Sequence, residues 1–262
     1  MGLRHPSSLW SVSLPDNRVV YLFGTIHLPI DAVDWNFTEL KKLILQCDAY
    51  YGEMNLDVIN EQGYAGMNLI PGGDSLVDLF SSVKKYEKVR QSILQSFNVD
   101  IDEFLHVRPL LIQHIIDRQI SGGDGQVMDY ALWNFCRNNK IPSDGLETLK
   151  DQFDILESID LNYQISILKT IARNTSRYRK YIRKMIQLYN AQNIVVLFKK
   201  GMKSCGAYRQ LLILDRNNRM AEKIMNIKTE TTFISVGVGH LSGNKGILAH
   251  LKRAGAKVKP LH

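Results

Sequence analysis

The sequence predicts an α/β (α+β) protein that forms a single domain over residues 1–262. Three observations support this: strand–helix–strand patterns lie near both ends of the chain, the stretch between them is mostly helical in pattern, and one short motif occurs in each terminal unit. With 45% hydrophobic and 23% charged residues, a chain of 262 residues buries roughly 70–75% of its unfolded surface. The chain is therefore long and apolar enough for one large core.

The N-terminal unit reads as a β-hairpin followed by a helix and another strand. Residues 9–12 and 19–23 are rich in β-forming residues, and the turn signal Pro15-Asp16-Asn17 separates them. A helical pattern at 38–46 and a strand at 49–54 follow. Together they predict a βαβ unit.

The middle of the chain predicts helices with one exception, a short strand that ends at Glu147. Breaks in the helical pattern fall near Asn98 and at Pro109, and a separate amphipathic helix covers 126–138. We therefore expect two helical insertions within the single domain, at about 75–125 and 150–225.

The C-terminal unit returns to the strand–helix–strand pattern. A strand at 232–236 leads into a glycine-rich loop at 237–243 and a helix that runs to Arg253. Gly255 is placed to end this helix, and 257–261 form the closing strand.

The two terminal units share a Gly-x-x-His-Leu motif. Residues 21–29 and 234–242 align without gaps at an offset of 213, so His27 and His240 both follow a strand. Ligands bind beyond the carboxyl ends of strands in open α/β sheets, and Glu53 ends the next strand of the first unit. Two imidazoles and a carboxylate form the ligand set of an open catalytic metal site, at which water is activated to attack a carbonyl group.

Simpler interpretations exist for each of these residues. A lone histidine after a strand is most often a hydrogen-bonded structural residue, but two in matched contexts favour a functional pair. Glu53 alone is equally consistent with a solvated strand end. The other histidines are expected to have surface or core roles: His5, His106, His114, His250 and His262.

Gly237, Gly239 and Gly243 approach the glycine fingerprint of a dinucleotide site. That motif requires an acidic residue about 20 positions further on, and residues 241–262 contain none. The three cysteines are far apart and form no C-x-x-C pair, so we expect neither disulfides nor a thiolate metal site.

The net charge of +7 is concentrated in one segment. Residues 161–214 hold eleven Lys and Arg and no Asp or Glu, so the remainder of the chain is mildly acidic. The tyrosines of this basic segment recur at helical spacing, which favours packing, and a nucleic-acid partner is not expected. We interpret the segment as a surface that guides an acidic substrate or partner, or that is simply solvated. No apolar run approaches the length of a membrane span.

At these motifs the sequence resembles the TraB/GumN family, whose animal branch is the Tiki proteins. The third of three matching stretches is the most specific, because its glycine-rich loop, helix and closing strand occur in order. The stretches are 21–27 with Glu53; 145–148 with Gln152; and 215–217 with Met220, continuing through 236–241 and Gly243 to Pro260.

The resemblance implies two pseudo-symmetric βαβ-type halves that form a mixed central sheet with a large helical insertion. In the Tiki branch it also implies a Gly-x-x-His-based, divalent-metal-dependent peptidase, with manganese or cobalt favoured and zinc possible. Carried over by position, His27, Glu53 and His240 become the metal ligands.

Three further residues are weaker site candidates. Glu147 is a candidate ligand or general base, or a helix-capping residue, and Arg216 is a candidate for stabilising an oxyanion, or for an ion pair with a neighbouring acid. Asp129 is a further candidate, on the helix at 126–138.

We therefore expect a hydrolase that cleaves a peptide bond in a peptide or protein substrate by a metal-activated water. The same residues are compatible with a metal-independent, histidine-based esterase, or with a non-enzymatic protein that binds a peptide or another ligand. The first thirty residues lack the pattern of a signal peptide. The resemblance nevertheless favours an exported protein, periplasmic or extracellular, whose signal peptide has been removed, with the cytoplasm as the alternative.

Overall fold

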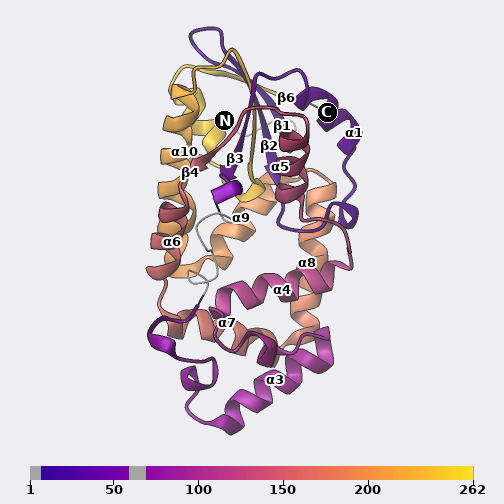
Figure 1. Cartoon of the computed structure of the whole chain (residues 1–262), viewed down its shortest axis with the longest axis vertical. Helices are drawn as coiled ribbons and strands as arrows, with labels where there is room; N and C mark the ends of the chain where they lie inside the picture. The colour runs from indigo at the N-terminus through magenta and orange to yellow at the C-terminus, as the bar shows by residue number, and fades with distance from the viewer. Residues whose placement is uncertain (1–6, 59–68, 262) are drawn as a thin grey trace.

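The computed structural model describes residues 7–58 and 69–261, and it has the predicted α/β architecture (Figure 1). A six-stranded sheet occupies one half of the molecule, and a layer containing α3, α4 and α7 lies beyond one edge of it. The strands are β1 (Leu9–Ser13), β2 (Val19–Thr25), β3 (Ala49–Met54), β4 (Ser143–Glu147), β5 (Thr231–Gly237) and β6 (Lys257–Leu261).

The helices fall where the sequence pattern predicts them, most of them between β3 and β5. The α-helices are α1 (Phe37–Ile44), α3 (Val83–Phe97), α4 (Pro109–Ser121), α5 (Met128–Asn138), α6 (Leu149–Glu157), α7 (Leu161–Arg173), α8 (Thr175–Asn190), α9 (Ile194–Ser204), α10 (Asp215–Asn226) and α11 (Ile247–Arg253). Short 3-10 helices lie at Ile30–Ala32, Pro71–Gly73, Val77–Leu79, Ile101–Phe104, Gly206–Tyr208 and Val238–His240.

The sheet is mixed, as expected, with the order β4-β3-β5-β2-β1-β6. β1 runs antiparallel to β2 and β6, whereas β4, β3, β5 and β2 are parallel. The two copies of the repeat lie side by side, because β2 pairs with β5 and Thr25 lies opposite Gly237. The chain therefore leaves both strands at the same edge of the sheet, and both motif histidines start from that edge.

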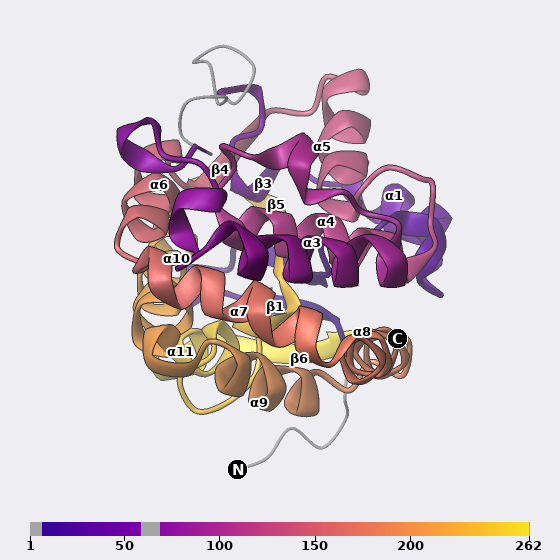
Figure 2. The same cartoon turned by 90° about the horizontal axis from the view of Figure 1, so that it is seen from below.

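The two faces of the sheet are buried under different helices, with α1 and α5 on one side and α9, α10 and α11 on the other (Figure 2). Towards α1 and α5, Tyr50 stacks on Phe233 at 6.2 Å between ring centroids and meets Trp133 of α5 edge to face. Because parallel strands are covered on both sides, β2 and β5 are buried along most of their length.

A second hydrophobic core joins α3, α4 and α7. The two predicted breaks are the ends of helices: Asn98 is left-handed at the C-terminus of α3, and Pro109 is the first residue of α4. This layer lies opposite the carboxyl edge of the sheet (Figure 1), so it closes over the site described below.

Two local features differ from the sequence expectations. The glycine-rich loop at 237–243 contains the 3-10 helix Val238–His240, and a π-helix at Gln210–Leu214 immediately precedes α10. Such π-helical turns are rare and occur frequently at functional sites.

The remaining expectations on termini and cysteines have simple outcomes. His5 and His262 lie outside the described residues. The three cysteines are free, and Cys47 and Cys136 are buried. Within the two described stretches, no helix has the length and apolar character that crossing a bilayer requires.

Candidate active site at the carboxyl edge of the sheet

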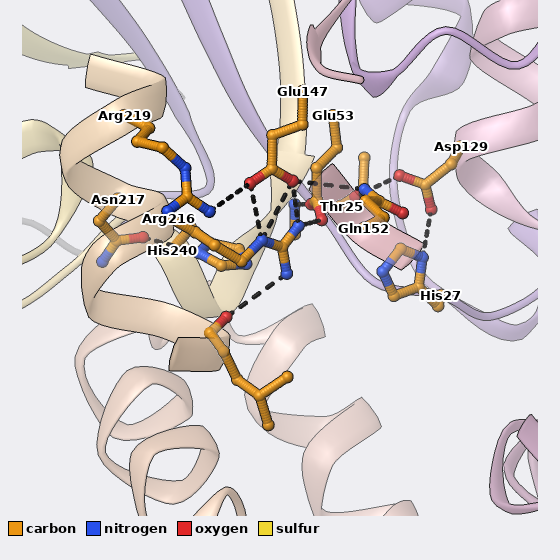
Figure 3. Close-up of polar contacts among 12 residues, drawn as sticks. Thr25, His27, Glu53, Asp129, Glu147, Gln152, Arg216, Asn217, Arg219 and His240 are labelled. Carbon is orange, nitrogen blue, oxygen red and sulfur yellow. Dashed lines mark hydrogen bonds and ion pairs between the residues drawn. The ribbon is translucent and has the colours of Figure 1, made fainter. Parts of the chain in front are cut away.

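The residues selected from the sequence converge at one edge of the sheet (Figure 3). His27 follows β2, Glu53 lies in β3, Glu147 ends β4, and His240 lies in the 3-10 helix after β5. Four neighbouring parallel strands thus each supply one side chain. Arg216, in the first turn of α10, reaches the same place from the side.

Gly237 forms the floor between the two imidazoles and the carboxylate. A Cβ atom at this position would lie 3.3 Å from Glu53 Oε2, 3.4 Å from His240 Cδ2 and 4.0 Å from His27 Nε2. The backbone N–H of Gly237 also donates to Glu53 Oε2 at 2.9 Å. All three side chains therefore border one small volume that exists because this residue has no side chain.

His27 is held by Asp129, the helical residue selected as a further candidate. Asp129 Oδ2 lies 2.9 Å from His27 Nδ1, and its other oxygen accepts a hydrogen bond from the hydroxyl of Thr25 at 2.7 Å. Because a carboxylate only accepts, His27 Nδ1 carries a proton and donates it. The Asp129 charge raises the pKa of His27 to about 9, although burial opposes this.

His240 is held in the same way by Asn217. The side-chain amide of Asn217 donates to the carbonyl of Lys245 at 2.8 Å, which turns its oxygen towards His240 Nδ1 at 2.6 Å. His240 Nδ1 therefore carries the proton, and Nε2 has a free lone pair. Burial and the nearby Arg216 lower the pKa of His240 to about 3, so this imidazole is neutral.

Arg216 links the two glutamates of the site. Its Nε and Nη2 donate to Glu147, the shortest contact being 2.6 Å, and Nη2 also donates to Glu53. Its third nitrogen, Nη1, has only a 3.4 Å contact with the carbonyl of Leu212 in the π-helix. Of the two roles expected for Arg216, the structure therefore contains the ion pair with neighbouring acids.

Glu147 does not cap α6. Thr148 caps this helix together with Asp151, whereas the Glu147 side chain is only 2% exposed and faces Arg216. Gln152 also donates to Glu147 Oε2, at 3.3 Å. Glu147 thus acts as the buried anchor of the arginine.

Neighbouring opposite charges determine the pKa values of Glu53 and Arg216. Burial alone would raise the pKa of Glu53, but the positive charges of Arg216 and His27 lower it far below its usual range. Burial lowers and the two glutamates raise the pKa of Arg216, with a net increase. Glu53 is therefore an anion and Arg216 a cation near neutral pH.

A cavity of about 260 Å³ opens from these residues towards α4 and α6. His27, Glu53 and Arg216 form its polar end. The rest of its wall is largely aliphatic and aromatic: Leu110, Leu111, Leu149, Phe153, Ile155, Leu156, Ile159 and Leu212.

A second depression, of about 200 Å³, lies on the other side of the same residues. It shares His27, Glu53 and Gln152 with the first and is lined further by residues such as Tyr50 and Trp133. The polar group therefore lies between two hollows, an arrangement that suits an extended ligand.

His114 also lines the larger cavity, which the sequence analysis did not anticipate. Its ring lies 6.3 Å from that of His27, between centroids, and burial together with the His27 charge lowers its pKa to about 4. The spacing of α4 shows which residues share a face but not that this face meets the sheet edge. Asn217 and Thr25 were also not selected, although the matching stretches 215–217 and 21–27 contain them, because no sequence pattern shows which ring each one contacts.

The donor chemistry of the two histidines fits a divalent metal ion. A ligating histidine usually donates its second N–H to a carboxylate or carbonyl group, and both imidazoles do so here. Nε2 of the neutral His240 is free, whereas Nε2 of His27 can ligate only after it loses its proton. Within residues 7–58 and 69–261, no three His, Cys, Asp or Glu side chains are yet gathered closely enough to share an ion. At this edge of the sheet, the Glu53 carboxylate accepts hydrogen bonds from Arg216 and from the backbone of Gly237.

The fold and the site define an α/β protein with two Gly-x-x-His imidazoles at the carboxyl edge of a mixed sheet. The model of the TraB/PrgY/gumN family matches residues 8–260, and the chain belongs to this family. The membership expected from the motifs is thus confirmed.

Three curated proteins are similar to the chain over almost its whole length. It is 22% identical over 313 residues to "Metalloprotease TIKI2" of Xenopus tropicalis, covering 97% of this chain and 59% of that protein. It is 21% identical to "Metalloprotease TIKI1" of Danio rerio, covering 98% and 64%, and 21% identical to "Metalloprotease TIKI1" of Xenopus tropicalis, covering 96% and 61%. The chain thus spans about three fifths of the length of these relatives.

Proposed function

We propose that this protein is a divalent-metal-dependent hydrolase that cleaves peptide bonds, with His27, Glu53 and His240 as the metal ligands. One observation carries the proposal: both imidazoles have their Nδ1 proton fixed by an acceptor, and both border the volume above Gly237. Similarity to three proteins named as metalloproteases supports the same chemistry.

Glu53 would complete the ligand set after Arg216 gives up its contact with this carboxylate. Manganese or cobalt suits a set that includes carboxylate oxygen, and zinc suits the two imidazoles. When bound, the ion supplies Lewis-acid activation of water and of a carbonyl group.

The chain's own residues supply positioning and charge. Asp129 and Asn217 fix the orientation of the two imidazoles, so little is left to reorganise during the reaction. Arg216 remains anchored by Glu147, and its weakly engaged Nη1 is the donor available to a carbonyl oxygen that becomes negative.

The two hollows favour a peptide as the substrate. A chain passing over His27 and Glu53 can place one side chain in the apolar cavity towards α6 and continue into the depression beside Trp133. The α4 residues Leu110 and Leu111 add apolar wall to this cavity, and a substrate that fills it would displace water from the reacting bond, which strengthens charge interactions there.

Metal titration tests the proposal directly. Protein purified without chelator is titrated with Mn²⁺, Co²⁺ and Zn²⁺ by calorimetry, and cleavage of a mixed peptide library is followed by mass spectrometry. We expect about one equivalent of metal per chain, with binding and cleavage both lost in His27→Ala and in His240→Ala. The matched control His106→Ala, an exposed histidine that does not line the cavity, should retain both.

Absence of stoichiometric binding of all three metals would overturn the metal part of the proposal. A second candidate then applies, because the hydrogen-bonded series Thr25, Asp129 and His27 is also suited to acid–base catalysis of ester hydrolysis without a metal. Activity that resists chelators and is lost in His27→Ala would select it. Recovery of an intact bound peptide after long incubation with metal would instead favour a binding protein.

A further inference from the structure

A further groove, separate from the two hollows at the sheet edge, lies between α3 and α7 in the helical layer. These two helices run side by side in both views (Figures 1 and 2). The groove has a volume of about 390 Å³, within the range of small-molecule sites, and Phe80 forms part of its wall.

Four cationic side chains line this groove, and none of its lining residues is acidic. Lys85 and Lys88 lie one turn apart on α3, and Lys169 and Arg173 lie one turn apart on α7. Two of the four come from the basic segment 161–214, none of whose Lys or Arg side chains lines either hollow at the sheet edge.

The four charges lack acidic partners in the part of the chain that the structure describes. No carboxylate there lies within 4.0 Å of any of them, and the nearby acid Glu87 pairs with Arg90 instead. Like charges gathered on facing helices repel one another, so an anion between them would be bound favourably.

The groove is fixed in place by contacts across it. The hydroxyl of Ser92 on α3 donates to the carbonyl of Ala172 on α7 at 2.6 Å, which sets the distance between the two helices. Lys169 Nζ lies 4.6 Å from the centre of the Phe80 ring, and Lys85 Nζ donates to Ser81 at 2.9 Å. Two of the four cations are thus already directed by neighbours.

We propose that the groove between α3 and α7 binds a compact, multivalent anion that carries phosphate groups. Lysine and arginine together recognise phosphate through charge-assisted hydrogen bonds, and two helices offering two cations each match an anion with more than one phosphate. The limited volume favours a small ligand over the extended backbone of a nucleic acid, which needs a longer basic track.

The test uses inorganic tripolyphosphate as the probe and the full chain at low salt. Binding is measured by calorimetry in the wild type and in the double variant Lys88→Gln/Arg173→Gln, which removes one exposed cation from each helix. We expect saturable binding of one equivalent, weakened at least about tenfold in this variant. The control Arg183→Gln/Lys184→Gln removes two exposed charges of α8 and should bind within about twofold of the wild type.

Equal weakening in both double variants would show a diffuse response to net charge and overturn the proposal, as would the absence of saturable binding. Groove-dependent binding of duplex DNA without binding of tripolyphosphate would also overturn it, in favour of a nucleic-acid surface. Labelling of the wild-type protein avoids any dependence on the folding of variants. Tripolyphosphate should protect Lys85, Lys88 and Lys169 from acetylation, read by mass spectrometry, and should leave Lys184 reactive.

Discussion

His27 donates its Nδ1 proton to Asp129 at 2.9 Å, across 102 residues of sequence. The contact joins the end of β2 to the first turn of α5 and aims the other ring nitrogen at the volume above Gly237. A residue on a helix thus determines what a residue beyond a strand can bind.

Replacing Asp129 with asparagine should weaken metal binding. The Asp129 carboxylate orients His27 and makes its ring more basic, and the amide of asparagine lacks this charge. Loss of a hydrogen-bond partner of a metal-ligating histidine typically lowers metal affinity about 10–100-fold. Calorimetric titration with Zn²⁺ and Mn²⁺ measures the change. Asp124→Asn makes the same substitution at an exposed site nearby and should leave the affinity unchanged; an equal loss in both variants would contradict the assigned role.

Gly237→Ala should fill the site without straining the backbone. The φ of Gly237 is −51°, which alanine adopts freely, but the new Cβ would approach Glu53 Oε2 to 3.3 Å. We expect at least about a tenfold loss of metal affinity and a decrease in unfolding free energy of roughly 1–3 kcal/mol. Gly239→Ala is the matched control, since its Cβ meets nothing within 4 Å; comparable metal affinities in the two variants would argue against a site above Gly237.

Glu147→Gln should destabilise the protein. The glutamate side chain is 2% exposed, and its replacement leaves a buried arginine with only one full carboxylate partner, at a cost on the order of 3 kcal/mol. Denaturant unfolding measures the difference. The control Glu39→Gln removes an exposed carboxylate paired with Lys42 and should change the unfolding free energy by less than about 1 kcal/mol. Equal decreases in the two variants would mean that Glu147 stabilises the protein no more than a surface carboxylate does.

Asp117, on α4, should make stability depend on pH. Burial raises its pKa to about 7 even though Tyr178 donates to it at 2.6 Å. Since the folded pKa lies above the unfolded value near 3.8, the stabilising proton is fully present below about pH 4 and is lost as the pH rises through 7. Thermal unfolding from pH 5 to pH 8 should therefore show Asp117→Asn gaining stability relative to the wild type, and a constant difference would refute the shifted pKa.

Most of the fold could be predicted from the sequence because its signals are local. The turn at Pro15-Asp16-Asn17, the helix start at Pro109 and the closing strand Lys257–Leu261 depend on residues close together in the chain. The internal repeat predicted that both histidines follow equivalent strand ends, whereas the pairing of β2 with β5 itself is seen only in the structure.

The site was accessible only in part. Strand ends bring His27, Glu53, Glu147 and His240 to one edge by topology alone, but the contacts of Arg216 depend on how α10 packs against the sheet. The spacing of residues in the sequence does not reveal how a helix packs against a sheet. The same holds for His114, which reaches the cavity only because α4 crosses below the edge.

The pairing of β2 with β5 joins segments 212 positions apart, for example Val19 with Thr231. During synthesis, this pair of central strands can therefore form only after all the helices from α1 to α10 have been made, and His27 has no second imidazole beside it until then. A chain interrupted before Thr231 carries His27, Glu53 and the other site residues up to Arg216, but it lacks Gly237 and His240. Completion of the proposed site thus depends on a strand pairing between distant parts of the chain, and not on any locally folded segment.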